Sequence, residues 1–237
     1  MKRKFLLMLA LWLSIVGSLL AQTRLYVDVS AVGSNAGTSW DNAYTSLKVA
    51  ITAAGEGDEI WVAAGTYYPT TDNDPQIWFN LKSGVAIYGG FDGTETSLNE
   101  RNWTNNVTIL SGDIGTIGNN TDNSYHVVYN DGVSNTAILD GFTITKGNSI
   151  DGGGIYNSNS SPVLRNLIIQ DNYANRWGGG IYIFLSSPTI TNCIITGNKS
   201  NDGGGIYIIN SSPTITNCIF TNNESIKGGG LCSNNFA

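Results

Sequence analysis

The sequence contains little charge. Asp, Glu, Lys and Arg make up 13% of its 237 residues, and the formal net charge is −6. Without the basic residues near the start, Lys2, Arg3 and Lys4, the charge becomes −9. A weakly charged, acidic chain is a poor ligand for nucleic acid or for an anionic membrane, so we expect neither as a partner.

Long hydrophobic runs are equally rare. The exception is residues 5–20, which follow the basic residues and precede Ala21. A basic start, an apolar stretch and a small residue are typical of a cleavable signal peptide, here residues 1–21. A membrane anchor is the alternative, but a bilayer requires about 20 apolar residues. We expect a mature chain without a transmembrane segment, either secreted or held at the cell surface or outer membrane.

Glycine, in contrast, is abundant, with 29 residues, and part of it recurs regularly. Gly-Gly-Gly triplets begin at positions 152, 178, 203 and 228, which are 26, 25 and 25 residues apart. Between them lie short apolar runs bounded by Gly, Ser-Pro or Asn, and these leave no room for a helix. A period of about 25 residues with short strands predicts an all-β, right-handed parallel β-helix whose regular repeats begin near residue 138.

The repeat places equivalent residues in columns that run from coil to coil. Stacked asparagine amides can hydrogen-bond along such a column, so we interpret the asparagines as a structural ladder. The glycine triplets are expected to allow backbone angles that other residues avoid. The three columns are Ile155, Ile181 and Ile206; Tyr156, Tyr182 and Tyr207; and Asn172, Asn198 and Asn223.

Cysteine is scarce, and all three residues, Cys193, Cys218 and Cys232, lie in the last fifth of the chain. An exported protein can form disulfides, although an odd number leaves one thiol over. Cys193 and Cys218 occupy equivalent positions about 4.8 Å apart in adjacent coils. Their parallel Cβ vectors give poor disulfide geometry, so we expect two buried thiols.

Residues 22–58 precede the expected β-helix and contain one helix candidate, residues 41–54. Its apolar residues recur at helical spacing, and Ser39 or Asp41 can cap its start. A solenoid needs an atypical element to shield its open end, and we assign this role to the helix. The β-helix then occupies residues 59–237 and stops within a coil, so we expect the natural protein to continue.

Several segments resemble families of known proteins. The Gly-Gly-Gly-Ile repeats and Phe220-x-x-Asn223 resemble the repeats of polymorphic outer-membrane proteins. Tyr88-Gly89-Gly90-Phe91 and the sequence around Trp61 are similar to secreted proteins of the pectate-lyase-like β-helix superfamily, which are common in Bacteroidetes-type bacteria. The resemblance implies export and a β-helix, and family members often end in a domain that attaches them to the cell surface.

That superfamily includes polysaccharide lyases and glycoside hydrolases, but their motifs are largely missing. Polygalacturonase-like hydrolases combine Asn-Thr-Asp, Asp-Asp, Gly-His-Gly and Arg-x-Lys, of which this chain has Asn120-Thr121-Asp122 alone. We interpret this tripeptide as a turn and the single histidine, His126, as structural. No lyase motif surrounds the basic residues of the repeats, which we expect on the solvent face.

One column is the candidate for chemistry. Asp151, Trp177, Asp202 and Lys227 each directly precede a glycine triplet and should stack on one outer face. Asp151 and Asp202 would be two coils, about 9.6 Å, apart. An inverting glycosidase separates its carboxyl groups by about 6.5–9.5 Å, so these two are the catalytic candidates, with Trp177 and Lys227 as binding candidates. The weakness is that nothing visible raises the pKa of either carboxyl.

A cofactor is not expected, with Ca²⁺ as the alternative. Two oxygen-rich segments, Asp72-Asn73-Asp74 and residues 113–122, could hold this ion, although neither matches an EF-hand loop. We interpret both as turns and therefore predict no metal ligands.

The sequence thus predicts an exported cell-surface β-helix without catalytic activity that presents an extended face for adhesion or for binding a polysaccharide or host glycan. The main support is the absence of catalytic clusters, since fold alone does not define function. The alternative is a polysaccharide lyase or glycoside hydrolase whose catalytic coils lie beyond residue 237. A purely structural surface stalk is a third possibility.

Overall fold

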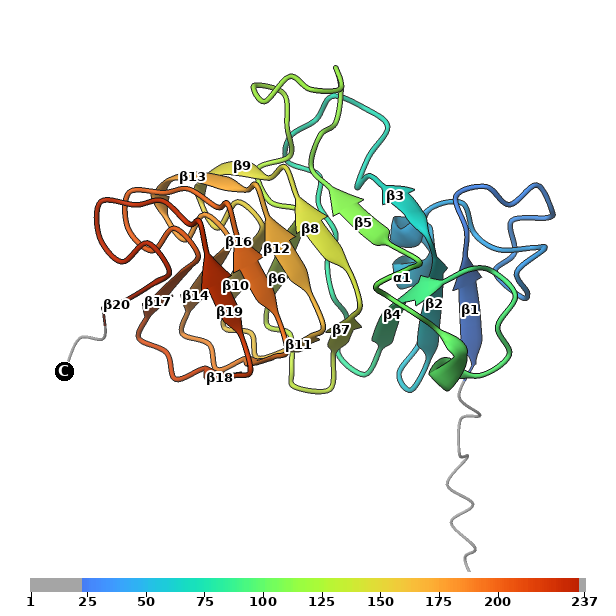
Figure 1. Ribbon diagram of the computed structural model, residues 1–237. Coiled ribbons are helices and arrows are strands. Elements are labelled where there is room, and N and C mark those ends of the chain that lie inside the picture. Colours follow the sequence, from blue (N-terminus) through green and yellow to red (C-terminus); the bar gives the residue numbers. More distant parts are fainter. Residues whose placement is uncertain (1–22, 235–237) are drawn as a thin grey trace, which may run out of the picture.

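The computed structural model describes residues 23–234, so the predicted signal peptide lies outside the described residues. The chain winds through successive coils whose strands pair in parallel with the coils before and after (Figure 1). The predicted parallel β-helix is therefore confirmed. Within the described residues, no helix has the length and hydrophobicity that a membrane crossing requires.

Three parallel sheets form the faces of the solenoid in residues 23–234. The seven-stranded face contains β1 (Arg24–Val27), β2 (Glu59–Ala63), β4 (Ala86–Phe91), β7 (Ile138–Asp140), β11 (Val163–Arg165), β15 (Thr189–Thr191) and β18 (Thr214–Thr216). The six-stranded face contains β3 (Gly65–Tyr67), β5 (Thr108–Ser111), β8 (Thr143–Thr145), β12 (Ile168–Gln170), β16 (Ile194–Thr196) and β19 (Ile219–Thr221). The five-stranded face contains β6 (Val128–Asp131), β10 (Ile155–Ser158), β14 (Ile181–Phe184), β17 (Ile206–Ile209) and β20 (Leu231–Asn234).

Two further strands lie between the six-stranded and five-stranded faces. β9 (Asn148–Asp151) and β13 (Tyr173–Trp177) pair in parallel, and we call them the two-stranded ridge. A 3₁₀ turn, η1 (Leu98–Glu100), lies in the connection from β4 to β5. Each regular coil therefore runs from the seven-stranded to the six-stranded face, through the ridge region, and back along the five-stranded face.

The corner between the seven-stranded and six-stranded faces explains one repeated asparagine. Asn166, Asn192 and Asn217 all have φ between 52° and 55°, and Gly141 has φ of 83° at the same corner. Asn tolerates this left-handed conformation better than most residues, and Gly adopts it freely. The chain therefore turns at Gly141, between β7 and β8.

The glycine triplets have two structural tasks. The first glycine of each, such as Gly152 with φ of 63°, adopts the left-handed conformation. The second and third have no room for a side chain. A Cβ on Gly153 would lie 2.2 Å from the carbonyl oxygen of Tyr173, and one on Gly154 would lie 2.5 Å from that of Gly180. The triplet thus turns the chain and then lets neighbouring coils approach closely.

The core consists of inward-facing columns. Ile155, Ile181 and Ile206 are fully buried and pair in register, as do the strands around them. Asn172 Nδ2 donates to Asn198 Oδ1 at 3.0 Å, and Asn198 Nδ2 donates to Asn223 Oδ1 at 3.0 Å. Stacked apolar side chains and an amide ladder therefore hold the coils in one register.

The helix in the N-terminal region differs from the sequence prediction in its length and in its N-cap residue. The helix α1 is shorter than the predicted residues 41–54 and spans Leu47–Ala53. Its N-cap position is Ser46, without a side-chain capping bond, rather than Ser39 or Asp41. Residues 42–45 do not join the helix because the backbone of Tyr44 exchanges hydrogen bonds with Tyr26 and Asp28 of the β1 segment.

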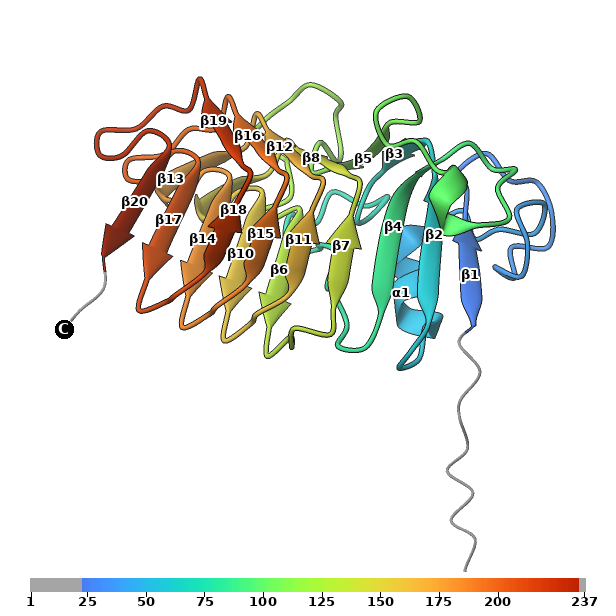
Figure 2. The same cartoon turned by 60° about the horizontal axis from the view of Figure 1, so that its bottom comes forward.

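The β-helix also begins earlier than residue 59. β1 already pairs in register with β2, so the first coil starts near Arg24. α1 follows β1 at the point where later coils place a strand of the five-stranded face, and Figure 2 shows it behind β2 and β4. Its buried residues Leu47, Ala50 and Ile51 join the main core, so α1 closes one side of the first coils.

A charged cluster surrounds Asp140, the last residue of β7. Asp140 is fully buried, and its Oδ2 lies 2.8 Å from Arg101 Nη2 and 2.6 Å from Arg165 Nε. Asn166 Nδ2 donates to the other carboxylate oxygen at 2.8 Å. Arg101 belongs to the β4–β5 connection and also stacks on Trp103. The cluster therefore fastens this connection to the solenoid.

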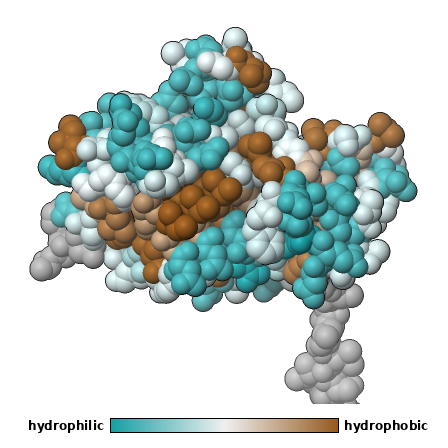
Figure 3. Space-filling view, in the orientation of Figure 1, coloured by the Kyte–Doolittle hydropathy of each residue, from teal (hydrophilic) through white to brown (hydrophobic). Residues whose placement is uncertain are grey.

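The outer surface of the six-stranded face carries an apolar stripe. Ile168, Ile194 and Ile219 pair in register and are 36%, 38% and 58% exposed. The stripe is visible in the middle of the space-filling view (Figure 3). Pairs of β-branched side chains that lie opposite each other in neighbouring coils add to the stability of the sheet.

Candidate functional site

The column before the glycine triplets lies on one outer face, as the repeat requires. Asp151 pairs with Trp177, Trp177 with Asp202, and Asp202 with Lys227, in successive coils. The four candidate residues are therefore stacked in the predicted order at the ridge side of the five-stranded face.

Both carboxylates of this column are engaged in ion pairs. Asp151 accepts hydrogen bonds from Arg176 Nε at 2.9 Å and from Arg176 Nη2 at 2.5 Å. Asp202 Oδ2 lies 3.9 Å from Lys227 Nζ. Each carboxylate is thus already bound by a cation of its own chain, whereas a general acid has to reach the leaving group of a substrate. The ion pairs therefore give the glycosidase hypothesis no support.

Trp177 packs against other aromatic rings instead of projecting alone. Its ring is nearly parallel to Tyr207, at 5.2 Å and 6°, and to Tyr182, at 6.0 Å and 9°. The guanidinium carbon of Arg176 lies 3.9 Å from the Trp177 ring centroid. Trp177 therefore packs over the rings of Tyr182 and Tyr207, with Arg176 against its own ring, so little of that ring is left for a ligand.

The tyrosine column is longer than the repeats suggested. Tyr129, Tyr156, Tyr182 and Tyr207 pair in register on the outside of the five-stranded face, and Cys232 takes the next position. The ring centroids of Tyr129 and Tyr156 are 5.0 Å apart with planes inclined by 7°. Alternation along the strand sends these rings outward because their neighbours, such as Ile155, point into the core.

Two further aromatic side chains extend the column at its other end. The His126 ring lies 5.0 Å from Tyr156 and 5.4 Å from Tyr129, and Trp78 lies 4.9 Å from Tyr129. His126 Nδ1 is 2.8 Å from the carbonyl oxygen of Gly152, which fixes the ring. Burial lowers the pKa of His126, so the imidazole is neutral over most of the physiological range.

A groove of about 450 Å³ opens between this aromatic cluster and β9 of the ridge. Tyr125 is 45% exposed and Ile150 is 63% exposed, so both present apolar surface to solvent at the groove. β9 contributes the polar residues Asn148, Ser149 and Asp151. The lining residues are Tyr125, His126, Tyr129, Asn148, Ser149, Ile150, Asp151 and Tyr156. Aromatic walls with a few convergent polar groups are typical of ligand sites.

Sequence reasoning found only part of this site. The repeat predicts Asp151 and Tyr156, whereas His126 is predicted to be structural and Tyr129 lies outside the predicted tyrosine column. The signal for Tyr129 was present, since it precedes Tyr156 by 27 residues, close to one coil. Tyr125 carries no periodic signal, because the preceding loop has no counterpart in the regular repeats.

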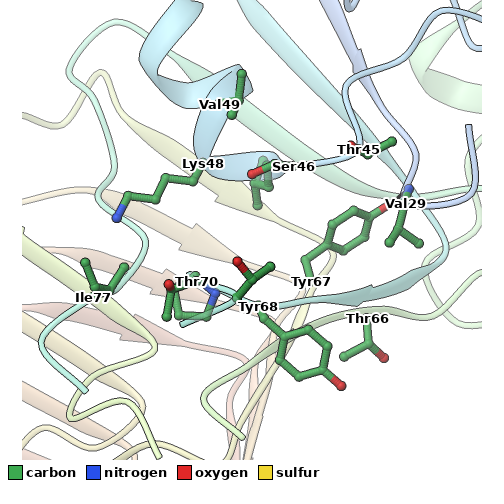
Figure 4. A pocket seen from close by; sticks show the side chains of 13 residues that line it. Val29, Thr45, Ser46, Lys48, Val49, Thr66, Tyr67, Tyr68, Thr70 and Ile77 are labelled. Atoms are coloured by element: carbon green, nitrogen blue, oxygen red, sulfur yellow. Dashed lines mark hydrogen bonds between the residues drawn. The ribbon is translucent and has the colours of Figure 1, made fainter. Parts of the chain in front are cut away.

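A second hollow, of about 490 Å³, lies between the start of α1 and the segment that follows β3 (Figure 4). Its walls are mainly hydroxyl and aliphatic groups. The Tyr67 hydroxyl is already used, because it accepts from the Val29 N–H at 3.2 Å and donates to the Ala63 carbonyl at 3.0 Å. We favour the aromatic groove as the functional site, since it combines a carboxylate, an imidazole and several ring surfaces.

The three cysteines are free thiols in the structure. Cys193 is fully buried, and Cys218 is half-buried in the adjacent coil. The hydrogen bond with Cys218, together with burial, raises the pKa of the Cys193 thiol. The same hydrogen bond lowers the pKa of the Cys218 thiol. The pair packs in and against the core, and neither cysteine lines the groove.

Comparisons with known proteins bear on the fold. No curated protein and no solved structure matches the chain. A family model described as "Right handed beta helix region" matches residues 79–237, about two thirds of the sequence. The match confirms the predicted handedness. The chain therefore belongs to the right-handed β-helix family.

Proposed function

We propose that this chain is an exported, non-catalytic β-helix that binds a glycan in the groove between β9 and the tyrosine column. The observation that carries the proposal is the concentration of aromatic side chains, Tyr125, His126, Tyr129 and Tyr156, around an open groove. The predicted signal peptide and the resemblance to secreted β-helix proteins support export to the cell surface or the medium.

The chemistry of the groove suits a sugar. The apolar faces of pyranose rings pack on aromatic surfaces, and tyrosine hydroxyls provide polar tips beside those surfaces. Asn148, Ser149 and Asp151 add hydrogen-bonding groups at the opposite wall for sugar hydroxyls. Such a site combines an apolar platform with a few polar contacts that set specificity.

The charge distribution favours a neutral glycan over a uronic acid polymer. Arg176 is paired with Asp151, which lines the groove. The net charge of the whole chain is negative, which repels a polyanionic ligand at long range. We therefore expect neutral glucans, xylans or mannans to bind more tightly than polygalacturonate.

The test is affinity electrophoresis of the full chain in gels that contain each of these polysaccharides, followed by calorimetry with an oligosaccharide of the best ligand. Truncation of Tyr125 or Tyr156 to Ala should weaken binding about tenfold, which corresponds to about 1.4 kcal/mol. Tyr68→Ala is the matched control, because Tyr68 is 40% exposed and lines the second hollow instead. Retention of full affinity in both groove variants would contradict the proposal.

A further inference from the structure

Buried oxygen atoms without hydrogen-bond partners are concentrated at one place in the described part of the chain. Of its six buried side-chain nitrogen or oxygen atoms that lack a partner, four are oxygens near the β5–β6 loop, residues 112–124. Such a group costs about 1–3 kcal/mol when nothing satisfies it, so four together call for a bound partner, either water or an ion. The four atoms are Asp122 Oδ1, Asn123 Oδ1, Ser124 Oγ and Thr145 Oγ1.

Three of these side chains are almost completely buried. Asn123, Ser124 and Thr145 are 3%, 0% and 8% exposed. Asn123 Nδ2 donates to the Lys146 carbonyl at 2.7 Å, so its free oxygen is an acceptor with no donor assigned to it. The hydroxyl oxygens of Ser124 and Thr145 also have lone pairs to offer. All four oxygens therefore have electron pairs to offer a cation, and the two hydroxyls can in addition donate hydrogen bonds.

Backbone hydrogen bonds join these residues in one layer of the solenoid. The Ser124 N–H donates to the Gly112 carbonyl at 2.8 Å, and the Gly112 N–H donates to the Thr145 carbonyl at 2.9 Å. Asn123 reaches the neighbouring residue of Thr145 through its amide. The end of the loop is thus fastened over the end of β8, with its oxygen-bearing side chains enclosed.

The same loop lies against the other oxygen-rich segment of the sequence, Asp72-Asn73-Asp74. A Cβ on Gly115 would lie 2.6 Å from Asp122 Oδ2 and 3.1 Å from Asn73 Oδ1, so these two oxygens lie within about 6 Å of each other. The Tyr125 N–H donates to the Pro75 carbonyl at 2.8 Å, which ties the two segments together. Figure 1 shows both loops projecting side by side above β5.

We propose that a Ca²⁺ ion binds beneath the β5–β6 loop, with Asp122, Asn123, Ser124 and Thr145 as side-chain donors. Ca²⁺ takes six to eight oxygen ligands in flexible geometry, and carboxylate, amide, carbonyl and water oxygens all serve. Within residues 23–234, no group of three His, Cys, Asp or Glu side chains comes together, which disfavours a zinc-type centre. Bound Ca²⁺ satisfies the buried oxygens and fixes the loop that leads into Tyr125.

The test needs no glycan and so is independent of the proposed function. The full chain is stripped with EGTA and titrated with CaCl₂ by calorimetry and by thermal unfolding. We expect one site per chain and a rise in Tm of about 5–10 °C at a hundredfold excess over Kd. A wild-type chain that shows neither binding heat nor a Tm shift would overturn the proposal and assign the buried oxygens to water.

Two variants and a control locate the ion. Asp122→Asn should weaken Ca²⁺ binding at least tenfold, and Thr145→Val, which is close in shape, should weaken it by a smaller factor. Asp72→Asn removes one exposed charge from the adjacent segment and should leave the affinity unchanged. Binding that is equally tight in Asp122→Asn and wild type would place the ion elsewhere. If Asp122→Asn fails to fold, as judged by circular dichroism, Thr145→Val and the wild-type titration decide the question.

Discussion

The asparagine ladder offers the sharpest test of how the repeats stabilise the fold. Asn198 is fully buried and makes contacts in both directions along the stack. Its Nδ2 donates to the Ile169 carbonyl at 2.8 Å and to Asn223 Oδ1 at 3.0 Å. Its Oδ1 accepts from the Asn172 backbone N–H at 3.1 Å and from Asn172 Nδ2 at 3.0 Å. Asn198→Ala therefore removes four hydrogen bonds from the interior.

The magnitude follows from what remains unsatisfied. The Asn172 amide nitrogen keeps its bonds to the Ile144 and Gln170 carbonyls. The Asn172 backbone N–H loses the acceptor Asn198 Oδ1, which costs about 1–3 kcal/mol. The two donor bonds of Asn198 add about 1 kcal/mol each. We expect Asn198→Ala to lower the free energy of unfolding by about 3–5 kcal/mol.

Urea denaturation followed by far-UV circular dichroism measures this change. Asn175→Ala is the matched control, because Asn175 is exposed on β13 and its amide accepts only a 3.4 Å bond from Tyr173. The control should stay within about 0.5 kcal/mol of wild type. A loss in Asn198→Ala as small as that of the control would refute the ladder as a source of stability.

Three further predictions address charge, pH and thiol chemistry. Asp140→Ala should destabilise the chain by about 3–5 kcal/mol in urea denaturation, because it leaves the 7% exposed Arg101 without its partner; a loss below 1 kcal/mol would contradict this. Burial lowers the pKa of His126 in the folded chain, so the unfolded chain binds a proton more readily and Tm should fall as the pH drops below about 6.5. His126→Phe should remove that part of the Tm profile, and an unchanged profile would refute the assignment. Cys193 should react with a thiol reagent only after unfolding, so rapid labelling in the native chain would contradict its burial.

The repetitive half of the fold could be predicted because each coil carries the same residue types at equivalent positions. The glycine triplets, the columns of Ile155 and Asn172, and the tyrosine register all follow from one period, and the structure preserves them in strand pairing. A pattern repeated in neighbouring coils leaves one register that buries every apolar position. The N-terminal coils lack this redundancy, so the helical spacing at Tyr44 was overridden by backbone pairing with the β1 segment.

The candidate site was less predictable, because it depends on irregular loops. The groove needs Tyr125, which follows a loop found in one coil, and the proposed cation site needs that same loop together with Thr145 of β8. The buried charge of Asp140 was also missed, since its partner Arg101 comes from an irregular connection. Periodicity describes what coils share, whereas ligand sites arise where one coil departs from the rest.

Hydrogen–deuterium exchange of the wild-type chain, with and without the best-binding oligosaccharide, tests the proposed groove most directly. Bound ligand should slow exchange in β9 and in residues 125–131, which line or support the groove. The second hollow beside β3 and the apolar stripe on the six-stranded face should exchange at unchanged rates. Protection confined to either of those surfaces, or protection at none, would contradict the assignment of this groove as the binding site.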